Sequence, residues 1–137
     1  MLMECSTVRK QTLDALAGNV SRYRKPILDA SMDQVRRTLY LADLQDPDAL
    51  PREEVSAAEL RRTPTGFILP IHWWCKVDLL GLCDFSGDLD FTPLLLDQTL
   101  ITLRGNFEIH ERGPQYEVDV AQLGLLMLQG FLEGLTQ

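Results

Sequence analysis

Basic residues are scarce in the second half of the chain. Residues 67–137 contain three Lys or Arg against ten Asp or Glu, whereas residues 1–66 contain ten of each, so the formal charge of −7 belongs wholly to the second half. Binding to nucleic acid depends on clustered Lys and Arg. We therefore expect a protein that binds the second half to be basic, and we do not expect nucleic acid to bind there.

Cysteine is rare, and uninterrupted apolar runs are short. The three cysteines, Cys5, Cys75 and Cys83, are too few for a disulfide scaffold. The longest apolar stretches, 67–83 and 120–135, are interrupted by charged or amide side chains and fall short of the roughly 20 apolar residues of a membrane-spanning helix. The start of the chain carries no charged-then-apolar leader. We expect a single domain of 137 residues, located in the cytoplasm and not in a membrane.

Motifs of known reactions are missing as well. The chain has no Gly-x-Ser-x-Gly, no glycine-rich phosphate loop and no dinucleotide-binding fingerprint. We therefore assign no catalytic residue and no cofactor, and we expect a protein that is not an enzyme.

Two groups of residues have the side-chain types of metal ligands but not the spacing that a metal site requires. His72, Cys75, Cys83 and His110 are zinc-ligand types, but His72 and Cys75 are three apart in a predicted strand and so point to opposite faces. Residues 84–90 place oxygen atoms at alternating positions, as a calcium loop does, yet they lack the glycine and the closing glutamate of such a loop. We therefore interpret 84–90 as a polar loop whose Asp and Ser side chains bond to their own backbone. We predict no metal site.

Apolar residues recur at helical spacing through the first half of the chain. The pattern predicts helices over about residues 4–24 and 28–45, and Ser31 with Gln34 has the spacing of a capping box. A third helix is predicted over 51–62, because proline suits the first turn of a helix and acidic residues follow it. We expect this half to be helical.

The period of the apolar residues changes from about 3.6 to 2 after residue 66. Alternation predicts strands over 71–79 and 101–110, with Gly105 at a bulge in the second. A Gly-Pro turn and further alternation at 115–119 predict that the second strand forms an antiparallel hairpin. The second half is thus expected to carry the sheet.

Two helices are also predicted in this half. Thr92 and Pro93 resemble the start of a short helix, and Asp119 with Gln122 resembles a capping box that opens the terminal helix. That helix is apolar over much of its circumference, so we expect it to be buried on more than one side. The predicted fold class is α+β, with N-terminal helices, then a small, mainly antiparallel sheet of three or four strands and a C-terminal helix packed on it.

One tryptophan breaks the alternation of the first predicted strand. Trp73 falls on the apolar face of that strand, but Trp74 falls on the polar face, where an indole is costly to leave in water. Either the helix predicted over 51–62 covers Trp74, or Trp74 anchors a partner, because tryptophan and arginine are enriched at the energetic centres of interfaces. The candidate partner-binding residues on this face are Trp74, His72, Arg104, Asn106, Glu108 and His110.

The terminal helix offers a candidate surface for a second copy of the chain. Gly130 and Gly134 are four residues apart and permit a close approach of two helices, either between two copies or within one subunit. The candidate dimer-interface residues are Leu125, Leu128, Gly130, Leu132 and Gly134.

The sequence favours a non-enzymatic interaction protein. We expect an adaptor, assembly chaperone or inhibitor that acts through the acidic, sheet-bearing surface as a homodimer. A small-molecule or catalytic domain is an alternative, which would need a concave polar pocket around His72, Arg104 and His110. A nucleic-acid-associated protein that uses the basic residues at 22–25, 36–37 and 61–62 is another, as is a structural subunit of a larger assembly, including a viral one.

Overall fold

The computed structural model describes the chain except for residues 47, 49–51, 78–79, 96, 111–118 and 136–137. Its helices are α1 (Leu13–Arg22), α2 (Arg24–Leu41) and α3 (Val120–Leu135). Its strands are β1 (Leu2–Arg9), β2 (Glu53–Ala57), β3 (Arg61–Thr63), β4 (Gly66–Val77), β5 (Gly81–Pro93) and β6 (Thr99–His110).

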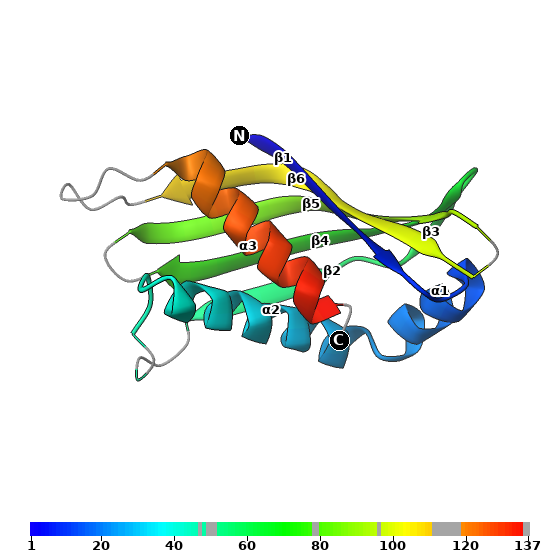
Figure 1. Ribbon diagram of the computed structural model, residues 1–137, viewed down its shortest axis with the longest axis horizontal. Helices are drawn as coiled ribbons and strands as arrows, with labels where there is room; N and C mark the ends of the chain where they lie inside the picture. Colours follow the sequence, from blue (N-terminus) through cyan, green and yellow to red (C-terminus); the bar gives the residue numbers. More distant parts are fainter. Residues whose placement is uncertain (47, 49–51, 78–79, 96, 111–118, 136–137) are drawn as a thin grey trace.

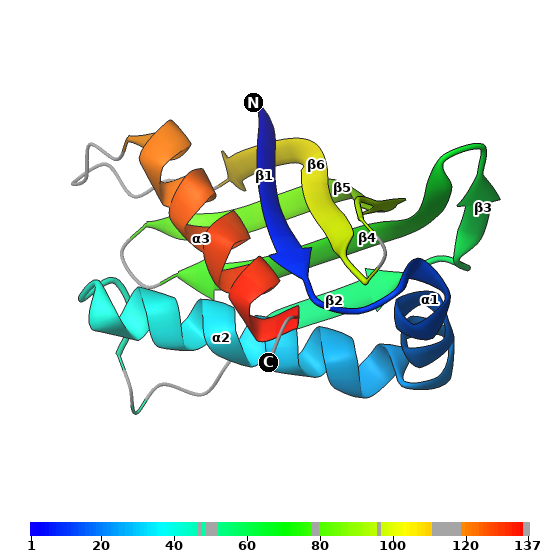
Figure 2. The same ribbon diagram turned by 45° about the vertical axis from the view of Figure 1, so that its right-hand side comes forward.

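The six strands form one antiparallel sheet in the order β1-β6-β5-β4-β2, and β3 pairs with the first residues of β4. Helix α3 lies across one face of this sheet, and α2 runs beside β2 (Figures 1 and 2). The prediction of N-terminal helices followed by three or four strands is therefore wrong. The chain begins with an edge strand of the sheet, and the first half contributes three of the six strands.

Residues 2–9 form a strand because their partner lies at the other end of the chain. The whole of β1 pairs with β6, and its side chains alternate between exposed and half-buried. The helix predicted over 4–24 begins only at Leu13, where the Thr12 hydroxyl accepts a hydrogen bond from the Ala15 amide at 3.2 Å. The helix prediction from apolar spacing agrees with the structure from Leu13 on. The error before Leu13 arises because no local pattern reveals that residues 2–9 pair with a strand about a hundred residues away.

The segment predicted as a third helix, 51–62, forms strands in its described part. Val55 lies opposite Trp73 of β4, and the side chains of β2 alternate between half-buried and exposed. The acidic residues that suit a helix start are equally compatible with an exposed sheet edge. The edge of β4 provides backbone partners for this segment, and those long-range hydrogen bonds override its helical propensity.

Helix α2 starts earlier than its predicted capping box. It runs from Arg24, with Pro26 in the first turn, where the missing amide hydrogen has no helical partner to lose. Ser31 is therefore in the helix interior, fully buried beneath α3, and caps nothing. The terminal helix agrees with its prediction, because Asp119 Oδ1 accepts hydrogen bonds from the amides of Ala121 and Gln122 at 3.1 and 3.2 Å.

Strand β5 replaces the predicted loop over 84–90 and the predicted helix that opens at Thr92. Its residues pair on one side with β4 and on the other with β6. The register of β5 with β6 runs without a bulge, and Gly105 lies directly opposite Gly87. The second arm of the predicted hairpin, 115–119, lies outside the described residues except for Asp119.

The core lies between the sheet and the helices α2 and α3. The Trp73 ring is fully buried and stacks on Phe85 and Phe131, with ring centroids 5.3 and 6.2 Å apart, and its centroid lies 6.4 Å from that of Phe107. These four aromatic rings occupy the space between the sheet and α3. None of the helices in the described part of the chain is long and apolar enough to span a membrane.

Candidate functional site

One face of the sheet carries no helix within the described residues. We call it the outer face, and it is made by the even-numbered residues of β1, β2, β4, β5 and β6, because odd-numbered residues of these strands point to the core. Most of its side chains are exposed or half-buried. The prediction that His72, Arg104, Glu108 and His110 share one face opposite the apolar one agrees with this arrangement.

Trp74 lies on the outer face and is half-buried. No helix covers it in the described structure, since the segment expected to do so forms β2 beside it. Cross-strand pairing places Trp74 in one row of side chains with Glu54 of β2, Asp84 of β5 and Glu108 of β6. The indole is thus flanked by carboxylates on a surface open to solvent.

Two imidazoles share the carboxylate next to Trp74. His72 Nε2 lies 2.6 Å from Asp84 Oδ1, and His110 Nε2 lies 3.7 Å from Asp84 Oδ2 and 3.4 Å from Glu108 Oε2. All four side chains are partly exposed. We call these four residues the Asp84 cluster. It presents two carboxylates and two imidazoles on the outer face.

The remaining candidate residues form a second set of contacts on the same face. Arg104 Nε donates a hydrogen bond to Glu4 Oε2 at 3.0 Å, and this bond and the charge of Glu4 raise the pKa of the fully exposed Arg104. Asn106 Nδ2 donates to Glu108 Oε1 at 2.9 Å. Asn106 is therefore tied to the Asp84 cluster, whereas Arg104 is already paired with β1.

The charge of the outer face is strongly acidic. Its cations on the five strands are Lys76 and Arg104. Its carboxylates on the same strands are Glu4, Glu54, Asp84, Asp88, Asp90 and Glu108. Three of these carboxylates, Asp84, Asp88 and Asp90, were predicted to lie in a polar loop. They lie instead in β5, which places their side chains along the outer face. A sheet surface with this excess of carboxylates attracts cationic groups.

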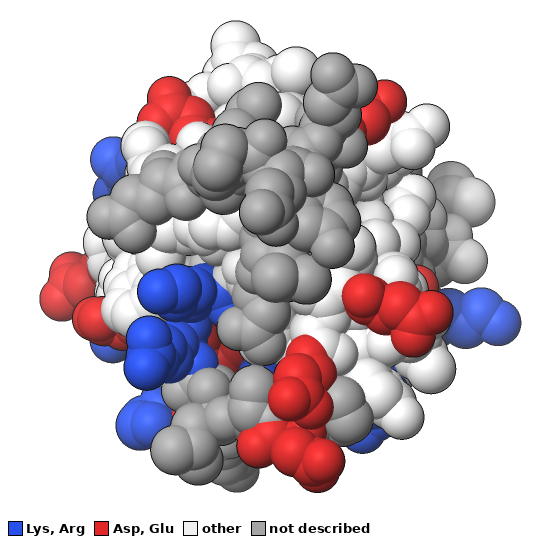
Figure 3. Space-filling model, turned by 90° about the vertical axis from the view of Figure 1, so that its left-hand side faces the viewer, with Lys and Arg blue, Asp and Glu red and all other residues white. Residues whose placement is uncertain are grey.

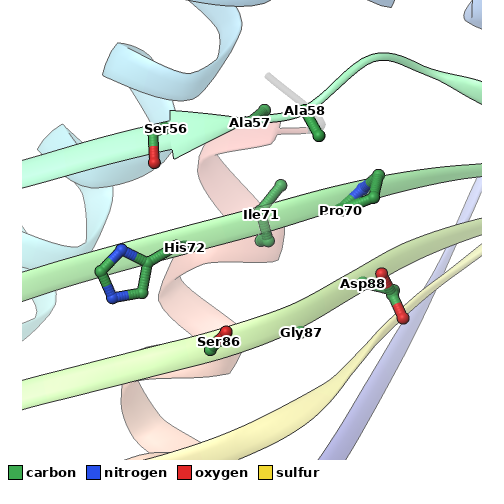
Figure 4. Close-up of a pocket in the computed structure, with 9 residues that line it drawn as sticks. All are labelled: Ser56, Ala57, Ala58, Pro70, Ile71, His72, Ser86, Gly87 and Asp88. Atoms are coloured by element: carbon green, nitrogen blue, oxygen red, sulfur yellow. The ribbon is translucent and has the colours of Figure 1, made fainter.

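A shallow hollow of about 410 Å³ lies on the outer face beside the cluster (Figure 4). Polar side chains of His72, Ser86 and Asp88 line it, together with Ser56 and Pro70. Ser86 lies opposite His72, but no hydrogen bond joins the two in the described part of the chain. A serine nucleophile would need its base within about 2.6–3.2 Å, so this arrangement lacks an activated nucleophile.

Neither Arg104 nor His110 lines that hollow. The concave pocket that the small-molecule hypothesis required around His72, Arg104 and His110 is therefore only partly present. The hollow is open along the sheet surface, and Figure 4 shows the side chains of Ser56, His72 and Ser86 on three neighbouring strands.

The zinc-type residues lie on two sides of the sheet. Cys75 and Cys83 face each other in the core, and the hydrogen bond between their thiols together with burial raises the pKa of Cys75 well above its ordinary value. His72 and His110 lie on the outer face. These four side chains cannot ligate one ion, and among the described residues no group of three or more His, Cys, Asp or Glu side chains is arranged to hold a metal ion.

The terminal helix presents most of its candidate dimer residues to its own chain. Leu128, Gly130, Leu132 and Gly134 are buried, and only Leu125 is exposed, at 40%. A Cβ built on Gly130 would lie 2.9 Å from Thr38 Oγ1, and one built on Gly134 would lie 2.6 Å from the Cα of Ser31. The glycines therefore bring α3 close to α2 within one subunit, and these four residues are not available to a second copy.

The basic residues of the first half are dispersed and partly paired. Arg36 contacts Asp33 and lies 2.7 Å from Glu53 Oε1, and Arg24 donates to the Ala58 carbonyl at 2.9 Å. On the end of the molecule shown in Figure 3, blue and red side chains are both present among uncharged ones. The described residues seen from that end do not form a field of one sign.

No model of a known protein family matches the chain, and no curated protein matches it in sequence. Among solved structures, the chain is similar to a hypothetical protein of Helicobacter pylori, with a TM-score of 0.47 and 9% identity over 99% of this chain and 86% of that one. It is also similar to a START superfamily protein of Mycobacterium smegmatis, with a TM-score of 0.45 and 13% identity over 98% of this chain and 94% of that one.

Proposed function

We propose that the protein is a non-enzymatic interaction module that binds a basic segment of another protein on the outer face of its sheet. The observation that carries the proposal is the position of Trp74, half-buried on a helix-free face between Glu54 and Asp84. An indole with carboxylates on both sides suits an arginine or lysine side chain, because the cation stacks on the ring while it pairs with an acid.

The packing of the interior supports a surface site. Aromatic side chains of the protein itself occupy the space between the sheet and α3, so a ligand there would have to displace Trp73 or its ring partners. Small-molecule sites bury most of the ligand surface, which the open hollow beside His72 does not do. That hollow instead suits one side chain of a longer partner.

The chemistry of the Asp84 cluster also fits binding more closely than catalysis. Asp84 and Glu108 offer carboxylate oxygens to a guanidinium, which forms paired hydrogen bonds with such groups. His72 and His110 already contact these acids, so an arriving arginine exchanges partners with them at little structural cost.

A synthetic peptide of alternating arginine and glycine tests the proposal, with a peptide of alternating glutamate and glycine as its control. Binding is measured by anisotropy of the labelled peptides at low and at physiological salt. We expect the arginine peptide to bind, more weakly as salt rises, and the glutamate peptide not to bind. Trp74→Ala and Asp84→Asn should each weaken binding about ten-fold or more, which is about 1.4 kcal/mol.

Asp43→Asn is the matched control for lost charge. Asp43 lies in the turn after α2 with a φ of 58°, which asparagine tolerates, and its loss should leave the affinity within about two-fold. The proposal fails if the arginine peptide does not bind at low salt, or if it binds wild type and Trp74→Ala equally.

A further inference from the structure

The outward edge of β1 is a row of backbone groups without partners in the described structure. The Met1 carbonyl accepts a hydrogen bond from the Phe107 amide at 2.8 Å, and the register continues with Met3 opposite Gly105. In an antiparallel pair, alternate residues of a strand bond to the same neighbour. The odd-numbered residues of β1 therefore bond to β6, and the amides and carbonyls of its even-numbered residues point away from the sheet.

The opposite edge of the sheet is better protected. Strand β2 has five residues, and α2 runs beside it, with Arg36 in an ion pair with Glu53. Strand β1 has eight residues, contains neither proline nor lysine, and keeps one register with β6 along its whole length. Long, regular edges of this kind readily pair with another strand.

Exposed apolar side chains lie near the two ends of β1. Leu2 is 82% exposed and Val8 is 49% exposed, and both point to the outer face. Five residues lie between them, with Cys5 in the middle, so in an antiparallel pair of two identical strands each lies opposite the other when the two-fold axis passes through Cys5. The strand is therefore complementary to itself in one register.

We propose that two copies of the chain join edge to edge through β1, in an antiparallel register centred on Cys5. Leu2 then lies opposite Val8 of the second copy, and Glu4 lies opposite Ser6 of the second copy. The even-numbered residues supply the hydrogen bonds between the copies. This interface uses none of the buried residues of α3.

Neighbouring registers are less favourable. Only shifts of two residues keep the free backbone groups paired. One such shift places Glu4 opposite Glu4 of the second copy, and like charges directly opposite one another are destabilising. The other places Val8 opposite Glu4 of the second copy and leaves Leu2 without an apolar partner.

The edge-to-edge dimer would join the two outer faces into one surface, because paired residues of adjacent strands point to the same side. Each copy carries a formal charge of −7, so the copies repel one another at low salt. Added salt screens this repulsion and is expected to strengthen the dimer, whereas it weakens the binding of a basic peptide. The two proposals therefore respond to salt in opposite directions.

Sedimentation of the full chain tests the dimer between about 10 and 200 µM, the range in which a small interface of micromolar affinity forms. We expect the mass to rise from monomer towards dimer with concentration. Ser6→Pro removes an outward amide and the Ser6 hydroxyl but no backbone hydrogen bond to β6, and should keep the protein monomeric with an unchanged circular dichroism spectrum. Ser6→Ala keeps the amide, removes only the 3.0 Å hydroxyl contact with Thr102, and should dimerise like wild type.

Val8→Lys tests the apolar contact without touching the backbone, and should weaken association at least ten-fold. Cys5 provides a second readout, because diamide oxidises two adjacent thiols to a disulfide and is itself reduced to the hydrazine by the two electrons and two protons released. We expect a covalent dimer from wild type and none from Cys5→Ser or Ser6→Pro. A chain that stays monomeric at every concentration and salt, or a folded Ser6→Pro that dimerises like wild type, would overturn the proposal.

Discussion

Trp73 and Trp74 are neighbours in the chain and lie on opposite faces of β4. Trp73 is fully buried in the aromatic core, and Trp74 is half-buried on the outer face among carboxylates. The same residue type therefore stabilises the fold at one position and, in the function proposed above, contacts a partner at the next.

Substitution of the two tryptophans should separate these roles. Trp73→Ala leaves a large cavity among three phenylalanines and should lower the free energy of unfolding by about 3–5 kcal/mol. Trp74→Ala removes a half-buried side chain from the surface and should lower it by about 1 kcal/mol or less. Urea unfolding followed by circular dichroism measures both. Equal losses would place Trp74 in the core and remove the basis of the proposed site.

The opposed glycines of β5 and β6 should tolerate no side chain. A Cβ on Gly87 would lie 2.6 Å from the Cα of Gly105 and still closer to the Arg104 carbonyl oxygen. Gly87→Ala should therefore destabilise the protein by about 1–3 kcal/mol. Gly18→Ala is the matched control, since Gly18 lies in α1 with nothing within 4 Å of a built Cβ, and alanine should stabilise that helix by about 0.5–1 kcal/mol. Thermal unfolding of both variants decides the point, and a neutral Gly87→Ala would contradict the close approach of the strands.

Glu53 should make stability depend on pH. Burial raises the pKa of Glu53 despite the opposing charge and hydrogen bond of Arg36. A carboxyl with a raised pKa in the folded state favours folding at low pH, and this contribution is lost as pH rises from the unfolded value towards the folded one. Glu53→Gln should therefore be neutral or stabilising by up to about 1 kcal/mol at pH 7, and the gain should fade as pH falls towards 4.

Urea unfolding of Glu53→Gln at a series of pH values measures this effect. The neighbouring variant Glu54→Gln, which removes the same charge from an exposed side chain, is the matched control. A loss of stability above about 1 kcal/mol in Glu53→Gln at pH 7 would mean that the ion pair with Arg36 outweighs the cost of burial.

The three thiols should differ in reactivity. Cys75 and Cys83 are buried opposite one another, and the pKa of Cys75 is well above its usual value because of the Cys83 thiol and burial. Cys5 is only half-buried, and burial raises its pKa as well. Ellman's reagent should therefore modify one thiol in the native protein, slowly at pH 7 and faster at pH 9, and all three in urea. Rapid modification of two or more native thiols would show that β4 and β5 open readily.

Some segments with a local signal were predicted in their correct structure, whereas others, such as 51–62 and the start of a helix at Thr92, were not. Alternation located β4 and β6, the Asp119 side chain located the start of α3, and helical spacing located α1 from Leu13 onwards. Strands β1 and β2 were missed because local propensity does not reveal the strands with which they pair, β6 and β4. Strand β5 pairs with the strands that precede and follow it in the chain, but its Asp, Ser and Gly residues are typical of a turn. The alternating acids of β5 have the composition of a polar loop, and only the pairing of β5 with β4 and β6 shows that they belong to a central strand.

The candidate site was predictable in composition but not in arrangement. The alternation of side chains along a strand was enough to place four residues on the polar side of their strands: Trp74, His72, Glu108 and His110. Asp84, which lies between the two histidines, was assigned to a loop, and Glu54 was assigned to a helix. Lateral neighbours in a sheet depend on strand order and register, and neither is contained in a single strand.

Three features follow directly from the amino-acid sequence, because each is a property of adjacent residues: the acidity of the second half, the two periods of apolar residues, and the departure of Trp74 from the alternation. Three other features appear only in the folded molecule: residues 2–9 form an edge strand, the glycines of α3 bring it close to α2, and no helix of the described residues lies on the outer face. Those features arise from contacts between segments far apart in the chain, whose free energy outweighs local propensity wherever the two disagree.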